Sequence, residues 1–250
     1  MITESKNIKD LDAAFMQGNI GIEKESLRIS DLKLSRIPHD HVLGSALYNK
    51  YITTDFSDAQ IEFITPPFNQ NKNVIAFLEN LHHYSSKKLD GEILWPLSMP
   101  PSRVKESEIP IAKYGKTNEG IFKEVYRHGL SNRYGRLMQT ISGVHFNYSL
   151  PEKIWENDIF LSNKKKTASL KNDVYMGAIR NLHRYNWLLI YLFGCSPIVS
   201  KHFLNKSYSF ENLKEEDFFL PFATSLRMSD LGYQNDNQSK LAVSFNSIEG

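Results

Sequence analysis

The chain of 250 residues contains a single cysteine, Cys195, so no disulfide can form within it. Nothing therefore requires an oxidising compartment, and we expect a cytoplasmic protein. The first residues lack the basic start and apolar stretch of a signal peptide. The longest apolar run, 187–199, is interrupted by Gly194 and Pro197 and is shorter than the roughly 20 residues that span a bilayer. We therefore expect no membrane segment and interpret this run as a buried helix end.

An excess of charge of one sign is also absent. The chain has 30 Lys and Arg against 28 Asp and Glu, a net charge of +2, which argues against a nucleic acid or an anionic membrane as the main partner. The sequence has neither a P-loop nor a Gly-x-Gly-x-x-Gly pattern, so a nucleotide would be bound by another route. With 41% hydrophobic and 23% charged residues, the composition is typical of a globular protein.

Two hydrophobic periodicities predict a mixture of strands and helices. Alternation, with β-branched and aromatic residues, predicts strands at 20–30, 51–56, 59–65, 137–150 and 241–245, the second and third being two strands or one bent strand. Helical spacing predicts helices ending near Gly18 and at about 73–88, 121–135 and 170–193. Because these elements do not form regular βαβ units, we expect an α+β fold with an antiparallel sheet, segregated helices and a long loop at 95–116.

Two of the predicted strands carry polar groups on one face. In strand 20–30, Glu23 and Glu25 share a face with Leu27 and Ile29. In strand 137–150, one face is apolar and is expected to pack on a core (Val144, Phe146, Tyr148 and Leu150). The opposite face is suited to a ligand cavity rather than to bulk solvent (Gln139, Gly143, His145 and Asn147).

The strongest candidate site is a set of acidic residues with one histidine: Glu23, Glu25, Asp55, Glu62 and His145. If the strands that carry them are neighbours, the carboxylates repel one another, and Mg²⁺ or Mn²⁺ would relieve that repulsion. Hard cations in turn indicate phosphate chemistry. The alternative is that these acids are surface charges paired with Lys24, Arg28 and their neighbours, and that the histidine is an interior residue with satisfied hydrogen bonds.

Other candidates have equally simple alternatives. Arg227 could clamp a phosphate or form a surface ion pair. Tyr126 and Tyr233 could line an apolar pocket or belong to the core. Cys195 has no evident partner for a catalytic thiol. Spacing alone does not decide among these roles.

Several longer blocks resemble the proteobacterial glutamate–cysteine ligase (γ-glutamylcysteine synthetase) family. The resemblance covers nearly the whole chain from Gly21, and blocks of this length are specific. They are Gly21–Arg28, Gly44–Leu47, Tyr51–Phe56, Glu62–Pro66, Trp95–Pro100, Asn132–Gly135, Met138–His145 and Ser225–Tyr233.

The resemblance implies the glutamine-synthetase-like carboxylate-amine ligase fold, in which a curved antiparallel sheet forms part of a funnel. It also implies the reaction. ATP phosphorylates the γ-carboxylate of glutamate, and the amine of cysteine attacks the γ-glutamyl phosphate to give γ-glutamylcysteine, the first step toward glutathione. The implied cofactors are ATP and Mg²⁺, with Mn²⁺ as an alternative. The implied partners are small-molecule substrates only, with no nucleic acid and no membrane; the oligomeric state stays open.

Matching motifs also imply roles for single residues. Glu23, Glu25, Asp55, Glu62 and His145 match the metal-site residues of the family. Arg227 matches the arginine that meets the transferred phosphate and the glutamyl group. Phe56, Tyr126, Leu130 and Tyr233 match positions around the cysteine side chain, and Ile141 lies beside the expected glutamyl site.

Length is the main departure from the family, whose members continue far beyond Gly250. We therefore expect residues 1–250 to form the N-terminal portion of a single catalytic domain whose C-terminal portion is missing. Two alternatives follow: a metal- or nucleotide-binding fragment without turnover, and a related ligase that joins glutamate to another amine. A nucleic-acid-binding module is a further alternative, against which the balanced charge argues.

Overall fold

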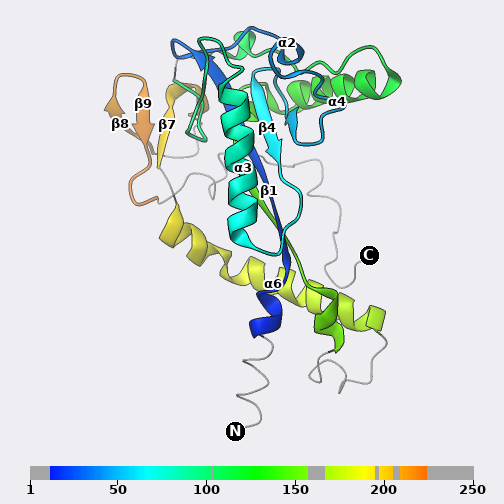
Figure 1. Ribbon diagram of the computed structural model, residues 1–250. Coiled ribbons are helices and arrows are strands. Elements are labelled where there is room, and N and C mark those ends of the chain that lie inside the picture. Colours follow the sequence, from blue (N-terminus) through cyan, green and yellow to red (C-terminus); the bar gives the residue numbers. More distant parts are fainter. Residues whose placement is uncertain (1–11, 103, 157–166, 195–196, 205–208, 224–250) are drawn as a thin grey trace. The chain divides into compact units, whose positions relative to one another are not determined.

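The computed structural model describes residues 12–102, 104–156, 167–194, 197–204 and 209–223 (Figure 1). The chain divides into two compact units, one of residues 18–149 and one that joins residues 1–17 to residues 150–250. Residues 12–15 are helical, within the helix expected to end near Gly18. The predicted strand 241–245 lies outside the described residues.

An antiparallel sheet built around one long strand forms the centre of unit 18–149. Strand β1 pairs with four others, and β3 pairs with β4, all antiparallel, which confirms the predicted α+β class and two separate strands at 51–65. The strands are β1 (Asn19–Ser30), β2 (Lys33–Leu34), β3 (Ile52–Thr54), β4 (Gln60–Ile64), β5 (Ile93–Leu94) and β6 (Val144–Ser149); the helices are α2 (His39–Leu43), α3 (Asn71–Ser86), α4 (Asn118–Tyr134) and the short 3₁₀ helices η1 (Glu106–Glu108) and η2 (Met138–Thr140).

Helix α3 covers one face of this sheet. Directly paired residues of antiparallel strands place their side chains on the same face; Ser26 opposes Ile61 on the face that α3 covers. Figure 1 shows α3 lying along β1 and β4. Helix α3 confirms the helix predicted at about 73–88, and Val74 and Leu81 on its apolar side are buried. The cluster between sheet and helix consists of Leu43, Ile52, Ile61, Phe63 and Leu81.

A buried ion pair lies at the far end of β1. The Arg28 side chain is fully buried and its Nη1 lies 2.8 Å from a carboxylate oxygen of Glu92, which is itself 4% exposed. The same guanidinium donates to the carbonyl oxygens of Ile37 and Asp58. Because a buried charge needs such partners, Arg28 stabilises the fold through these contacts and does not pair with the acidic residues of β1.

The predicted strand 137–150 is wrong in its first half. Residues 138–140 form η2, and strand β6 begins only at Val144. The reason is the loss of ladder partners: the Gly143 N–H donates to the side chain of Glu25 instead of a backbone carbonyl, and the Ser142 N–H donates to the Ser98 carbonyl.

The apolar face of β6 is exposed, contrary to the prediction that it packs on a core. Val144, Phe146 and Tyr148 are 62%, 65% and 41% exposed. Strand β6 pairs with β1 alone among the described strands. Alternation therefore predicted which side chains share a face, but not whether that face is covered.

Helix α4 shows the same difference between spacing and burial. Thr117 caps its N-terminus by accepting a hydrogen bond from the Gly120 N–H, and Gly135 ends it with φ 78°, close to the predicted end. Its apolar stripe nevertheless faces outward, since Ile121, Phe122, Val125 and Tyr126 are all exposed.

The second unit contains a long helix and a small antiparallel sheet. Its elements are η3 (Glu152–Glu156), α6 (Thr167–Phe193), β7 (Ile198–Ser200), η4 (Lys201–Phe203), β8 (Glu211–Lys214) and β9 (Asp217–Phe219), with strand order β7-β9-β8. Ile154, Trp155 and Leu170 form its buried cluster. Helix α6 confirms the predicted helix, but the interpretation of a buried helix end is wrong: Trp187 and Phe193 are 56% and 73% exposed.

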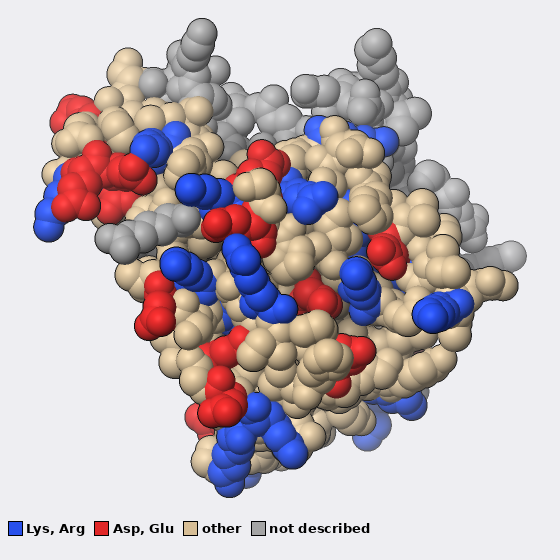
Figure 2. Space-filling model, turned by 90° about the horizontal axis from the view of Figure 1, so that it is seen from above, with Lys and Arg blue, Asp and Glu red and all other residues tan. Residues whose placement is uncertain are grey.

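No helix in the described part of the chain combines the length and hydrophobicity needed to cross a bilayer. Charged side chains of both signs are interspersed on the face shown in Figure 2, with no extended patch of one sign among the residues coloured there. A surface for nucleic acid would instead gather Lys and Arg on one stripe.

Candidate functional site

Strand pairing brings four of the predicted metal-site residues onto one face of the sheet. Glu25 of β1 lies directly opposite Glu62 of β4, and Glu23 of β1 lies directly opposite His145 of β6. This face is the one opposite α3. The period of two in β1 places Glu23 and Glu25 side by side, so three strands contribute to one cluster.

Glu23 and His145 are in direct contact. The Nδ1 atom of His145 lies 3.1 Å from Oε2 of Glu23, and the amide of Asn147 donates to Oε1 of the same carboxylate at 3.1 Å. One ligand atom each from Glu23, Glu62 and His145 lies within 4.8 Å of the others. This spacing is close enough for three side chains to bind one cation.

Glu25 is held at the inner end of the cluster. Its Oε2 accepts a hydrogen bond from the Gly143 N–H at 2.8 Å and lies 3.5 Å from the amide nitrogen of Gln60. Gln60 is fully buried, and its amide also donates to Ser142. Buried hydrogen bonds of this kind fix the orientation of a carboxylate.

Glu62 shows the electrostatic effect of this crowding. Burial raises the pKa of the Glu62 carboxyl to about 7, and the negative charges of Asp55, Glu25 and Glu23 add to the rise, which His145 partly offsets. Burial also raises the pKa of Asp55, against the opposing effects of Arg127 and His145. Like charges held together in a partly dry site favour binding of a cation.

The donor set fits a divalent cation. Carboxylate oxygens are the ligands of Mg²⁺ and Mn²⁺, and an imidazole nitrogen is more suited to Mn²⁺ than to Mg²⁺. The alternative, pairing with Lys24 and Arg28, is not what the structure shows: the Lys24 ammonium donates to Ser26 at 2.6 Å, and Arg28 pairs with Glu92.

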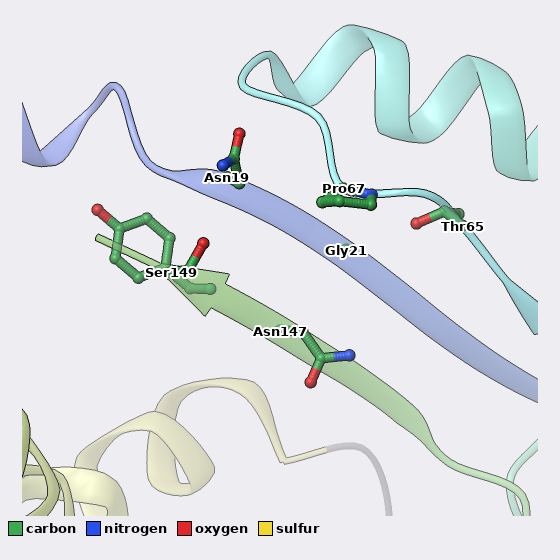
Figure 3. Close-up of a pocket in the computed structure, with 7 residues that line it drawn as sticks. Asn19, Gly21, Thr65, Pro67, Asn147 and Ser149 are labelled. Atoms are coloured by element: carbon green, nitrogen blue, oxygen red, sulfur yellow. The ribbon is translucent and has the colours of Figure 1, made fainter. Parts of the chain in front are cut away.

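A pocket continues this face of the sheet beyond the cluster. Its volume is about 290 Å³, and its lining comes from the first residues of β1, the end of β6 and the segment after β4: Asn19, Gly21, Thr65, Pro67, Asn147, Tyr148 and Ser149. Figure 3 shows Asn147 on β6 beside Gly21 on β1. Amide and hydroxyl groups thus line a hollow next to the carboxylates, where they can hydrogen-bond to a polar ligand.

The other predicted site residues are in different surroundings. Phe56 is 1% exposed in a core cluster against which Leu130 packs, whereas Tyr126 is 58% exposed on α4. Ile141 is partly buried between η2 and β6. Arg227 and Tyr233 lie outside the described residues, as does Cys195. The roles predicted for these residues therefore stay predictions.

Sequence reasoning missed three residues at the site: Gln60, which contacts Glu25, and Tyr114 and Arg127, which contact the main chain of Asp55. Gln60 was hidden in an apolar strand pattern, and Tyr114 lies in the long loop at 95–116. Arg127 of α4 donates from Nε to the backbone carbonyl of Asp55. A polar residue inside an apolar strand was a usable signal for Gln60, but no local pattern links α4 to the turn before β4.

The fold defines the class of protein. A crystal structure of glutamate–cysteine ligase from Francisella tularensis in complex with AMP matches 93% of the chain and 46% of that protein, with a TM-score of 0.84 and 36% identity. A bifunctional glutathione synthetase from Pasteurella multocida matches 99% of the chain and 30% of its own, with a TM-score of 0.81 and 31% identity. With its antiparallel sheet and flanking helices, the chain has a carboxylate-amine ligase fold.

Within this class, the chain belongs to the glutamate–cysteine ligase family. The family model matches residues 5–250. The glutamate–cysteine ligase of Aliivibrio salmonicida is 46% identical over 240 residues, which are 94% of this chain and 46% of that relative. The chain thus spans about half the length of the curated relatives it matches. The resemblance inferred from the sequence blocks is confirmed.

Proposed function

We propose that residues 1–250 form the N-terminal portion of a single catalytic domain that joins glutamate to cysteine at the expense of ATP. The products are γ-glutamylcysteine, ADP and phosphate. Family membership and the AMP complex of the Francisella tularensis relative support the proposal. The observation that carries it is the convergence of Glu23, Glu62 and His145 within 4.8 Å. The expected place of work is the cytoplasm.

In the proposed reaction, Glu23, Glu25, Asp55, Glu62 and His145 hold Mg²⁺ or Mn²⁺. A cation held there would supply positive charge against the phosphate groups during transfer of the terminal phosphoryl group of ATP to the γ-carboxylate of glutamate. The chain supplies orientation: the Gly143 N–H and the Gln60 amide fix Glu25, and Asn147 fixes Glu23. Arg227 would meet the transferred phosphate, and Phe56, Tyr126, Leu130, Ile141 and Tyr233 would surround the amino acid substrates.

A direct test is ADP release by the purified chain with ATP, Mg²⁺ and glutamate, with and without cysteine. We expect release that rises with cysteine and is lost in Glu62→Gln, because this variant removes the negative charge of a carboxylate ligand while keeping the side-chain shape. A matched control is Glu79→Gln, a variant of an exposed carboxylate on α3, which should leave the rate unchanged. ADP release at the same rate with and without cysteine would contradict the proposed reaction.

The acceptor amine is tested in the same assay. Replacing cysteine by alanine, serine or 2-aminobutyrate should lower ADP release, since a pocket that fits one small side chain discriminates by about 10- to 200-fold against its near relatives. Equal rates with alanine and cysteine would favour a related ligase with another acceptor.

A second candidate function is binding without turnover. It is favoured by the convergence of one ligand atom each from Glu23, Glu62 and His145 within 4.8 Å, an arrangement that can bind a cation whether or not turnover follows. In this case the folded chain binds Mn²⁺ but releases no ADP under any combination of substrates. Mn²⁺ binding and ADP release, measured on the same preparation, therefore separate the two functions.

A further inference from the structure

We propose that Arg127 and Tyr114 are positioning residues for the metal site: together they clamp the main chain at Asp55 and so place its carboxylate at the cluster. This inference rests on the metal site of the proposed function. It concerns two residues that contact Asp55 through its main chain, and it is argued from the contacts around the segment between β3 and β4.

Tyr114 forms the first half of the clamp. Its side chain is 4% exposed. The hydroxyl donates to the carbonyl oxygen of Thr54 at 2.8 Å, lies 3.2 Å from that of Asp55, and accepts a hydrogen bond from the Thr54 side chain at 2.8 Å. One buried phenol therefore holds two consecutive residues of the main chain just before the turn.

Arg127 forms the second half, from α4. Its Nε donates to the Asp55 carbonyl. Two further contacts fix the guanidinium itself: Nη1 donates to the Lys123 carbonyl at 3.0 Å, and the group stacks 4.6 Å from the centre of the Tyr114 ring. A planar guanidinium that is bonded and stacked loses little freedom on holding its partner.

The clamp acts on the metal site through Asp55. The Asp55 carboxyl is near enough to Glu62 and His145 for their charges to influence one another. Between the clamp and β4, the Asp55 N–H donates to the Gln60 carbonyl at 3.3 Å. The backbone of this residue is thus bonded on both its N–H and its carbonyl, which fixes the point from which the Asp55 side chain extends.

The charge of Arg127 distinguishes a positioning role from a purely electrostatic one. A fixed positive charge near a cation site opposes cation binding. If charge were the main effect, removing it would strengthen metal binding. If position is the main effect, Arg127→Lys, which keeps the charge but loses the Nε–H bond and the planar stack, should weaken metal binding.

The experiment measures Mn²⁺ binding to the 250-residue chain by electron paramagnetic resonance of the free ion. Because partners that orient metal ligands typically contribute about 10- to 100-fold in metal affinity, we expect Arg127→Lys and Tyr114→Phe each to raise the Kd about tenfold or more. The control is Arg136→Lys. Arg136 also donates from a guanidinium to a backbone carbonyl, that of Ile109 at 3.0 Å, but not at the cluster, and its variant should bind within about twofold of the parent.

Each result supports or overturns the proposal. Thermal melting without metal reports the structural effect of every variant, and Tyr114→Phe provides the test if Arg127→Lys does not fold. A lower melting temperature with an unchanged Kd in both variants would show that the clamp serves the fold alone. An unchanged Kd in Arg127→Lys with tighter binding in Arg127→Met would show that charge, not position, is what Arg127 contributes. No Mn²⁺ binding by the parent chain would overturn the metal site itself, and the clamp with it.

Discussion

Replacing Glu62 by glutamine should make the metal-free protein more stable, although it removes a residue of the proposed site. Burial and the neighbouring carboxylates raise the pKa of Glu62 from 4.5 to about 7. The folded state therefore binds this proton more tightly than the unfolded state does, and stability falls as the pH rises from about 4.5 to 7. Above that range the ionised carboxylate destabilises the fold in full.

The size of the effect follows from the shift. At about 1.4 kcal/mol for each unit of pKa, a rise to about 7 corresponds to about 3 kcal/mol. Because Glu62 is partly exposed, solvent screening reduces this figure, and we expect about 2 kcal/mol. The glutamine in Glu62→Gln cannot ionise, so the free energy of unfolding of this variant should exceed that of the parent by about 2 kcal/mol at pH 8 and equal it at pH 4.

The assay is urea denaturation in EDTA at both pH values, followed by the same measurement at pH 8 with Mn²⁺. A cation that binds only the folded parent stabilises it by mass action, so Mn²⁺ should narrow or reverse the advantage of Glu62→Gln. A variant that is less stable than the parent at pH 8 in EDTA would refute the reasoning, because it would mean that the ionised carboxylate is stabilised by its neighbours.

Three further predictions concern stability, all measured by urea denaturation. Glu92→Ala leaves the buried guanidinium of Arg28 without its carboxylate and should cost about 3–5 kcal/mol; a cost below about 1 kcal/mol would contradict the pairing. Gly120→Ala places a Cβ 2.5 Å from a carbonyl oxygen and should cost about 1–3 kcal/mol, whereas Gly129→Ala on the same helix meets nothing within 4 Å and should stabilise by about 0.5–1 kcal/mol. Burial and the charge of Arg28 lower the pKa of His39 from 6.5 to about 4. The stability that the neutral His39 contributes is therefore complete above pH 6.5 and is lost as the pH falls toward 4, by about 3 kcal/mol in total. If a His39→Gln variant lost stability equally steeply over this range, His39 would not be the cause.

Much of the fold could be predicted from local patterns. The alternation in 20–30 placed Glu23 and Glu25 on one face of β1, and helical spacing located α3 with Val74 and Leu81 toward the sheet. These predictions succeeded because each depends on the period of a single element. The acids of the cluster could be predicted for the same reason, since residue type and face were visible together.

What failed depends on contacts between distant segments. The start of β6 is set at Gly143, whose carbonyl still accepts from the Glu25 backbone N–H but whose own N–H donates to the Glu25 side chain instead of a backbone carbonyl. The exposure of Phe146 and Phe122 depends on what lies over them, which periodicity does not contain. The contact between Arg127 and Asp55 joins residues 72 positions apart. Periodicity in the sequence shows which side chains share a face of an element, but contacts between distant segments are seen only in the folded structure.

The pairing of β1 with β6 also sets an order of events during synthesis. Strand β1 and strand β4 are close in sequence and can pair soon after residue 64 has left the ribosome. The partner of Glu23 on the other side, His145, is made much later. Pairing over such a sequence distance is slow because a long loop must close first. On this order, Glu25 and Glu62 can pair before His145 is made, and a cation bound at that stage would have only oxygen ligands from β1 and β4.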